Sequence, residues 1–367
     1  MGNSWKSMFS GMLLGLMPFA TSAGTVAEAV ARDAKVVADE KESKGLLSKA
    51  LSKVDTRLSE HLNISGFILG RAQYSSDPKN FGGFDIRMLR LIMNGDISKS
   101  FSYRIQMEMA GGPRILDAWL EWKRYDFFRI RAGQMKRVFT FENPWSPVTL
   151  GVPDYSQVIM KLSGFTDRVG EHSCGGRDVG IMVSGDFVRM ETHPLFRYEV
   201  GVYNGNGINK ADNNKFKDVI GSLYMRPIKN LHIGGGYWLG KYGPQDKMVD
   251  RNRWTVGFKY DDSRYLLRGE YIASKGKKPD QPDSSDDADG WYVTAGVPVA
   301  KHLKAFVKYD VYRDNKSFDS QCTKYVAALN WNVHKYIILQ ASYFYEDNKM
   351  PGSRNSNNAV AQMFVRF

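Results

Sequence analysis

The chain has 367 residues, a formal net charge of +12 and a mean hydropathy of -0.41. No stretch reaches the roughly 18 to 20 consecutive apolar residues that a transmembrane helix needs, so the sequence excludes a helical membrane protein. A membrane β-barrel stays open, because half of every barrel strand faces water and such a chain resembles a soluble protein in composition.

Residues 1–23 have the pattern of a secretory signal peptide. Lys6 gives a thin basic start, Met8 to Ala20 form a short apolar run, and Thr21-Ser22-Ala23 is a small-residue cleavage site. Export argues against nucleic acid as the partner of this basic chain. The excess of Lys and Arg therefore indicates anionic lipid or anionic solutes.

Residues 24–61 form a second segment, rich in Ala, Lys, Glu and Leu and without proline. Four apolar residues repeat in it at a 4-3-4 spacing, which is a narrow helical stripe: Leu47, Leu51, Val54 and Leu58. We interpret the segment as a short periplasmic helix or coiled coil. A charged, frayed lead-in to the next domain is the alternative.

From residue 62 to 367 the hydrophobic pattern has a period of two, which is typical of β-strands. Sixteen candidate strands are centred near residues 68, 90, 105, 119, 131, 182, 200, 222, 236, 256, 269, 294, 308, 327, 341 and 363. An even number of strands suits a closed barrel, which has no exposed edge. We therefore predict an all-β fold, a 16-stranded antiparallel transmembrane β-barrel over residues 62–367.

The links between the predicted strands alternate in length. Short links separate long polar ones, and this asymmetry is typical of outer-membrane barrels; the short links are 97–100, 227–230, 261–264, 299–302 and 332–335. Aromatic residues fall on the predicted lipid face, as interfacial girdles require: Tyr74, Trp122, Tyr237, Trp254, Tyr260, Trp291, Tyr309, Trp331, Tyr343 and Tyr345. The chain ends on the same face with Phe367.

The stretch from Phe127 to Phe187 differs from the rest. Arg129 and Arg131 alternate with apolar neighbours, and a second alternating strand begins only after residue 176. The intervening loop, residues 138–176, is rich in proline, glycine and charge. We predict that this loop folds back into the barrel lumen, with Trp145, Tyr155, Ile159 and Met160 packed against the inner wall.

Three stretches resemble the phosphate-selective porin O and P family, in its Bacteroidota-type form. They are IRAGQMKRVFTFEN at 130–143, GRDVGIMVSGDF at 176–187 and YEVGVYNGNGINKADNNKFKDVIGSLYMRP at 198–227. With the strand spacing and the terminal Phe367, the resemblance extends over residues 62–367. It implies a sixteen-stranded barrel, usually a homotrimer, whose third outward loop narrows the pore.

Strand parity predicts a set of basic side chains on the lumen face. We expect these to line the pore and bind anions: Arg71, Arg90, Arg104, Lys123, Arg129, Arg131, Arg268 and Lys308, with Lys161 and Arg168 from the long loop. Glu142, Asp154 and Asp167 oppose them within that loop. The planar fork of Arg suits phosphate, although pairing with a lumen carboxylate across strands is the alternative for each Arg. Because a full ladder of Arg cannot be laid onto the sequence, a general anion preference is the safer expectation.

Catalytic and metal-binding patterns are missing from the sequence. The six His residues lie singly, and no nucleophile elbow, metal-spaced His pair or phosphate loop occurs. The two cysteines, Cys174 and Cys322, lie near strands far apart around a barrel, and their pairing stays open. We expect no enzyme, no cofactor and no metal site.

These observations predict a porin in the outer membrane of a Gram-negative bacterium, with a periplasmic N-terminus. It would pass small, phosphate-like anionic solutes by passive diffusion through a basic-lined, loop-constricted pore. Two alternatives stay open, a plugged structural or adhesive surface barrel and an unselective general porin. The expected partners are small anionic solutes, outer-membrane lipid and lipopolysaccharide, and two further copies in a homotrimer.

Overall fold

A computed structural model describes residues 61–79, 82–170, 173–278 and 287–367. The predicted signal peptide (1–23) and all but the last residue of the predicted helical segment (24–61) lie outside the described residues. Within the described ranges, the helices lack the length and apolarity needed to cross a membrane.

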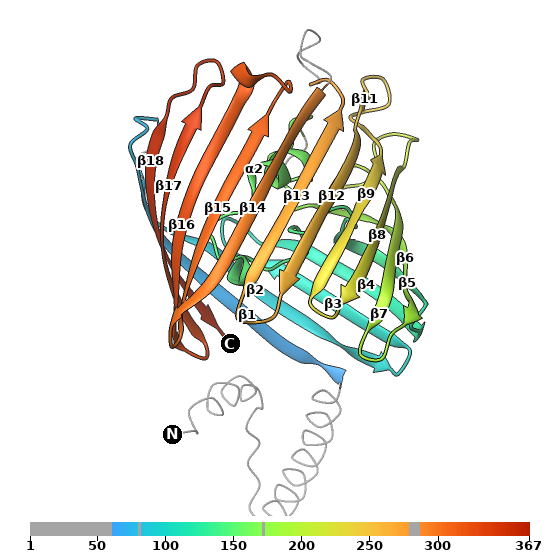
Figure 1. The fold of residues 1–367 in the computed structure, drawn as a ribbon. Helices are drawn as coiled ribbons and strands as arrows, with labels where there is room; N and C mark the ends of the chain where they lie inside the picture. The colour runs from blue at the N-terminus through green and yellow to red at the C-terminus, as the bar shows by residue number, and fades with distance from the viewer. Residues whose placement is uncertain (1–60, 80–81, 171–172, 279–286) are drawn as a thin grey trace, which may run out of the picture. The chain divides into compact units, whose positions relative to one another are not determined.

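Sixteen strands of the described residues form one closed antiparallel barrel, which confirms the predicted fold (Figure 1). The first eight are β1 (Asn63–Ser75), β2 (Gly83–Ser98), β3 (Phe101–Glu108), β4 (Arg114–Tyr125), β5 (Phe128–Lys136), β6 (Arg177–Arg189), β7 (Pro194–Tyr203) and β8 (Asp218–Ile228). The second eight are β9 (Leu231–Leu239), β12 (Asn252–Asp261), β13 (Leu266–Lys275), β14 (Asp287–Ala300), β15 (Leu303–Arg313), β16 (Gln321–His334), β17 (Ile337–Asn348) and β18 (Ser356–Arg366). Each predicted strand centre falls inside one of these strands.

The barrel closes where the first strand meets the last. β1 pairs with β18 in antiparallel register, so that Ile68 lies opposite Val365. The terminal residue extends this pairing, because the Gly66 nitrogen donates to the Phe367 carbonyl at 3.0 Å and the Phe367 nitrogen donates to the Gly66 carbonyl at 3.1 Å. The backbone of the chain's last residue is therefore part of the closure.

The two ends of the barrel differ in their links. At one end, neighbouring strands are joined by two to four residues: 99–100, 126–127, 190–193, 229–230, 262–265, 301–302 and 335–336. The links at the other end are longer, and one contains a small hairpin of β10 (Lys241–Tyr242) and β11 (Val249–Asp250). We call these the short-turn end and the long-loop end (Figure 1).

The outer face of the barrel is apolar and exposed, as a wall in contact with lipid requires. Six of the predicted lipid-face aromatics are exposed: Tyr74, Tyr237, Trp254, Trp291, Trp331 and Tyr343. Several neighbouring rings touch across strands, including Trp291 and Tyr309, whose centroids lie 5.0 Å apart. The polar and charged faces of the same strands therefore point into the lumen.

The main hydrophobic core lies inside the barrel rather than between layers of a soluble fold. It forms between the wall and residues 137–176, the lumen loop, which contains η1 (Pro147–Thr149) and α2 (Gln157–Leu162). Val158, Ile159 and Leu162 of α2 are fully buried, and they pack in one cluster with wall residues such as Tyr292 and Phe306. The prediction that this loop folds inward is confirmed.

Replacement of one buried loop residue tests this packing. We expect Leu162→Ala to weaken docking of the lumen loop by about 2–5 kcal/mol, because the substitution leaves a cavity in a filled core. Amide hydrogen exchange in residues 157–162 should accelerate. Leu329→Ala, on the exposed outer face of β16, is the matched control, and equal acceleration of loop exchange in both variants would contradict the packing.

Candidate functional site: the pore constriction

Backbone groups of the lumen loop are held by polar side chains of the far wall. The Phe141 nitrogen donates to both carboxylate oxygens of Glu270 at 3.1 Å, and the Gln157 nitrogen donates to Asp310 at 2.9 Å. The Gly151 carbonyl accepts from Asn330 at 3.1 Å and from Gln340 at 3.2 Å. The loop is thus bonded to β13, β15, β16 and β17.

Two carboxylates of the loop, Glu142 and Asp167, bind the same side of the barrel, and a third, Asp154, binds β2. Glu142 lies 3.1 Å from the Arg268 guanidinium and 3.6 Å from the Lys308 ammonium, with all three side chains almost fully buried. Asp167 pairs with Arg253 at 2.6 Å, and both side chains are inaccessible to solvent. Asp154 pairs with Arg87 of β2. The acidic groups that the sequence places opposite the pore cations are therefore occupied in ion pairs.

The charge state of these carboxylates follows from their partners. Burial alone would raise the pKa of Glu142, but Lys308 and Arg268 outweigh it and lower that pKa below its usual value. The pKa of Asp167 is likewise lowered against its burial, by Arg253. Both groups are ionised at neutral pH and hold their cations as salt bridges.

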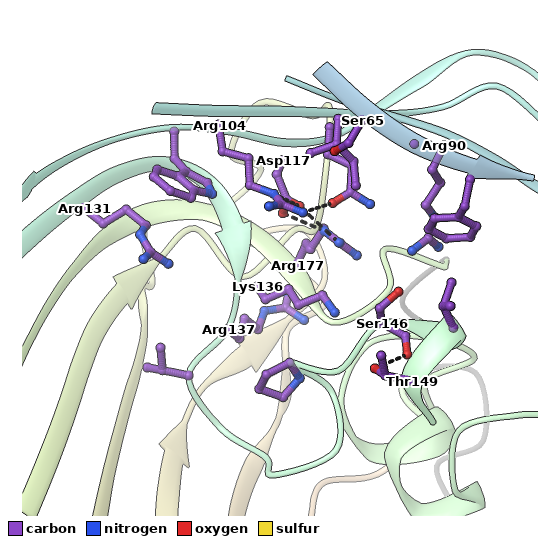
Figure 2. Close-up of a pocket in the computed structure, with 18 of the residues that line it drawn as sticks. Ser65, Arg90, Arg104, Asp117, Arg131, Lys136, Arg137, Ser146, Thr149 and Arg177 are labelled. Carbon is purple, nitrogen blue, oxygen red and sulfur yellow. Dashed lines mark hydrogen bonds and ion pairs between the residues drawn. The ribbon is translucent and has the colours of Figure 1, made fainter. Parts of the chain in front are cut away.

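A cavity of about 570 Å³ remains between the lumen loop and the wall formed by β1 to β6 (Figure 2). We call this space the constriction. Its lining includes seven basic residues: Arg90, Arg104, Arg131, Lys136, Arg137, Arg177 and Arg366. Apart from Arg137, the loop side of the lining is uncharged, with Thr140, Ser146 and Thr149 among its residues.

Most of the basic side chains pair with a carboxylate in the wall. Arg90 lies 3.0 Å from Glu108, and Arg131 lies 2.7 Å from Glu121. Both pairs join directly opposed residues of neighbouring strands, as the cross-strand alternative anticipates. These guanidiniums are held in place but keep part of their surface open, with side chains 13% and 26% exposed.

Two further arginines share one acid. Arg177 binds Asp117 through two nitrogens, at 2.8 and 3.2 Å, and the Arg104 Nε lies 3.6 Å from the same carboxylate (Figure 2). The single carboxylate of Asp117 is therefore the ion-pair partner of two guanidinium groups. Arg137, by contrast, is buried in a pair with Asp178 at 2.7 Å.

Lys136 is held by carbonyl groups. Its ammonium contacts the Asn143 carbonyl at 2.5 Å and the Trp145 carbonyl at 3.4 Å, both in the lumen loop. Among the residues that the structure describes, no carboxylate lies within salt-bridge distance of it. Five of the lining cations (Arg90, Arg104, Arg131, Lys136 and Arg177) therefore have three carboxylate partners (Glu108, Asp117 and Glu121). Arg366 and Glu199 also line the cavity, and Glu199 is paired with Arg197.

The remaining predicted site residues lie elsewhere. Arg71 pairs with Asp85, Lys123 with Asp96 at 2.6 Å, and Arg129 with Asp186 at 3.2 Å. Arg268 and Lys308 are buried between the loop and the wall. Arg168 is buried against Asp314 and the Gly276 carbonyl, and Lys161 lies partly exposed in the last turn of α2.

Sequence parity missed Lys136, Arg137 and Arg177. The alternation that places Arg129 and Arg131 inward is interrupted at Gly133, whose φ of 127° is open to glycine but rarely to other residues. Beyond it, Lys136 pairs with Arg177 in register and both line the constriction. Both residues do lie within the stretches that carry the family resemblance.

Both cysteines are buried. The thiol of Cys174 donates to the Gly164 carbonyl at 2.7 Å, and that of Cys322 donates to Glu346 at 3.4 Å. The open question of a bridge between them is thus answered for this structure, in which each thiol has its own partner.

The buried pair of Asp167 and Arg253 offers a test of how the loop is held. Asp167→Ala leaves a fully buried guanidinium without its counter-charge, so loop docking should weaken by about 3–5 kcal/mol. We expect increased current noise from single channels and new proteolytic cleavage within residues 137–176. The control is Asp246→Ala, at an exposed carboxylate of the link between β10 and β11. If Asp167→Ala showed neither increased current noise nor new cleavage, the pair would not be what holds the loop.

Comparison with known proteins agrees with this architecture. The chain resembles the anion-selective porin from Comamonas acidovorans at 15% identity, over 83% of this chain and 99% of that one, with a TM-score of 0.64. The outer membrane channel DcaP of Acinetobacter baumannii gives 14% identity, coverage of 83% and 97%, and a TM-score of 0.59. The trimer form of OmpT from Vibrio cholerae is 15% identical, over 83% of this chain and 99% of that one, with a TM-score of 0.56. At these identities the likeness shows the fold alone.

Part of the chain also matches a model of a known protein family. No curated protein matches the chain. Residues 63–229, which contain β1 to β8 and the constriction's basic wall, match the model of the phosphate-selective porin O and P family. The predicted resemblance to this family is confirmed over residues 63–229, and it indicates an outer-membrane channel for small solutes rather than an enzyme.

Proposed function

We propose that this channel passes small anions, phosphate-like solutes among them, by passive diffusion through the constriction. One observation supports the proposal: five cations of the basic wall have three carboxylate partners, and the one charged loop residue in the lining, Arg137, is paired with Asp178. The loop's own carboxylates are paired with Arg268, Arg253 and Arg87. A net positive charge is therefore left around this cavity.

A confined positive potential favours anions for a general physical reason. Low-dielectric walls focus the field of fixed charges, which raises the local concentration of the opposite ion in a narrow channel. The paired arginines contribute oriented N–H donors as well as charge, since an ion pair with a carboxylate fixes the position of each guanidinium. They present N–H groups to a passing solute without losing their own partner.

Lys136 has a particular role in this proposal. An ammonium has three N–H donors, and two of them are engaged by loop carbonyls, so one is left for a solute. A buried charge without a counter-ion is costly, and a permeating anion would relieve that cost transiently. We therefore place the solute's closest contact at Lys136, between Arg104, Arg131 and Arg177.

The ten predicted basic residues then divide by role. Arg90, Arg104 and Arg131 would meet the solute. Arg268, Lys308 and Arg168 would act by holding the lumen loop, because they are buried against it. Arg71, Lys123, Arg129 and Lys161 would shape the potential at the approaches to the constriction.

The proposal extends to assembly and orientation. OmpT of Vibrio cholerae has a trimer form, and the Comamonas porin is described as anion-selective; both share this fold. We propose a homotrimer with its N-terminus and short-turn end in the periplasm, and its long loops near lipopolysaccharide. Short periplasmic turns and long outward loops are the usual arrangement of outer-membrane barrels.

Lys136→Gln tests the proposal in proteoliposomes that contain the full barrel. Removing one unit charge near the solute should slow permeation of a small organic acid about fivefold, corresponding to roughly 1 kcal/mol at contact distance in water. Permeation of a neutral polyol of similar size should stay unchanged. The ratio of the two initial rates is the readout.

Lys335→Gln is the matched control, because this exposed residue lies in a turn at the short-turn end. It should leave the ratio unaltered. An equal fall in polyol permeation would mean that Lys136 supports pore shape rather than anion preference. Absence of both fluxes from folded wild-type protein would instead indicate a plugged barrel.

A further inference from the structure

The turns at the short-turn end of the barrel are rich in basic residues. Each of the seven turns has an exposed Lys or Arg within it or within two residues of it, and we call this set the basic rim: Lys99, Arg124, Arg189, Lys229, Arg264, Lys301 and Lys335. Counted with two residues on either side, these turns contain nine Lys and Arg and four Asp and Glu. The long-loop links without the lumen loop, counted in the same way, contain sixteen and thirteen. The basic bias is therefore stronger at the short-turn end.

Most residues of the basic rim have no acidic partner at close range. Among the residues that the structure describes, only Arg189 of this set lies within salt-bridge distance of a carboxylate, at 3.5 Å from Asp126, and these side chains are 83% and 70% exposed. So exposed a pair contributes little to stability and leaves both groups open to solvent. Asp262 accepts instead from backbone nitrogens, those of Arg264 at 3.0 Å and Tyr265 at 2.6 Å. The rim cations are thus accessible to a partner outside the chain.

Exposed aromatic rings accompany these cations. Arg124, Arg264 and Lys335 each lie over the ring of the next residue in the chain, with 5.8, 5.7 and 4.6 Å between the charged group and the ring centroid. All three rings are exposed: Tyr125, Tyr265 and Tyr336. A tyrosine beside a cation at the end of an apolar wall suits the headgroup layer of a membrane, where the ring meets hydrocarbon and the cation meets phosphate.

The arrangement of the rim also indicates the kind of partner. The seven turns join β2 to β3, β4 to β5, β6 to β7, β8 to β9, β12 to β13, β14 to β15 and β16 to β17, so they follow the circumference at one end of the barrel (Figure 1). A soluble protein or peptide would meet such a ring on one side only. A lipid leaflet surrounds the barrel, and a leaflet with anionic headgroups matches the ring in charge as well.

We propose that the basic rim binds the headgroups of anionic phospholipids in the leaflet at the short-turn end. The inference rests on the proposed orientation for one point, that this leaflet is the periplasmic one. Each rim cation would meet a phosphate oxygen, and the neighbouring ring would pack against the glycerol and upper acyl region. A zwitterionic headgroup also has a phosphate, but its own ammonium offsets that charge. Anionic lipid would therefore be enriched around this end of the barrel.

Spin-labelled lipids measure this preference directly. Full-length protein is refolded into phosphatidylcholine vesicles, and a trace of spin-labelled phosphatidylglycerol or phosphatidylcholine reports the fraction of each lipid held at the barrel surface. We expect phosphatidylglycerol to associate more strongly, by about fivefold beside each rim cation. At 1 M salt the Debye length is about 3 Å, so the preference should disappear. Equal association of the two lipids at low salt, or a preference that persists at 1 M salt, would overturn the proposal.

A triple variant locates the preference on the rim. It removes three rim charges: Arg264→Gln, Lys301→Gln and Lys335→Gln. The matched control removes three exposed charges from the long-loop links: Lys247→Gln, Lys349→Gln and Arg354→Gln. The rim variant should lower the preference for phosphatidylglycerol, and the control should leave it unchanged. An equal fall in both variants would assign the preference to total charge and overturn the rim. The salt measurement on wild-type protein holds even if a variant fails to fold.

An acidic protein is the competing partner. In that case the wild type would show no lipid preference but would retain poly-glutamate in detergent, and the rim variant would release it; this result would overturn the lipid assignment.

The other proposals can fail separately. Preference for phosphatidylglycerol without anion preference in the flux assay would refute the anion channel alone, and the converse would refute the rim alone. Protease added to intact cells tests the orientation, since it should cleave the long loops. If it does not, while the lipid preference holds, only the assignment to the periplasmic leaflet is overturned.

Discussion

The structure depends on how the lumen loop is held against one side of the barrel. Its carboxylates Glu142 and Asp167 are buried with arginine and lysine partners from the wall, and its backbone donates to Glu270 and Asp310. A buried charge is stable only with its counter-charge, so these pairs fix the loop's position closely. Without them, 40 residues rich in glycine and proline would have no defined path through a water-filled lumen.

The ion pairs that hold the loop also separate acidic from basic side chains across the lumen. Glu142 and Asp167 are turned toward β12, β13 and β15, so these two acids do not oppose the basic side chains on the opposite wall. The third acid, Asp154, is occupied by Arg87 of β2. The constriction is then lined by neutral loop residues on one side and by Arg90, Arg104, Arg131, Lys136 and Arg177 on the other. The same ion pairs thus position the loop in the lumen and hold Glu142 and Asp167 away from the basic wall.

The barrel could be predicted from the sequence because each barrel strand has a recognisable local pattern of residues. Alternation of apolar and polar residues is local, and so are the short links, so strand number and loop asymmetry could be inferred without three-dimensional information. The lumen loop was recognisable as the one long interruption between alternating strands. Its burial followed from Tyr155 and Ile159, apolar residues that a solvent-exposed loop would seldom contain.

The constriction was only partly predictable. Arg90, Arg104 and Arg131 follow strand parity, but Lys136 does not, because the backbone at Gly133 interrupts the alternation. The role of Arg268 and Lys308 in holding Glu142 depends on contacts across more than a hundred residues, which no local pattern encodes. Parity correctly placed these cations in the lumen, but it could not show which of them the loop covers.

We propose that the distribution of charge around the constriction makes this channel prefer anions. The most direct measurement is the zero-current potential of the refolded wild-type protein in a planar bilayer under a KCl gradient at neutral pH. We predict a potential of the sign set by chloride, with a magnitude that falls as ionic strength screens the lumen charges. A potential of the sign set by potassium would contradict the account.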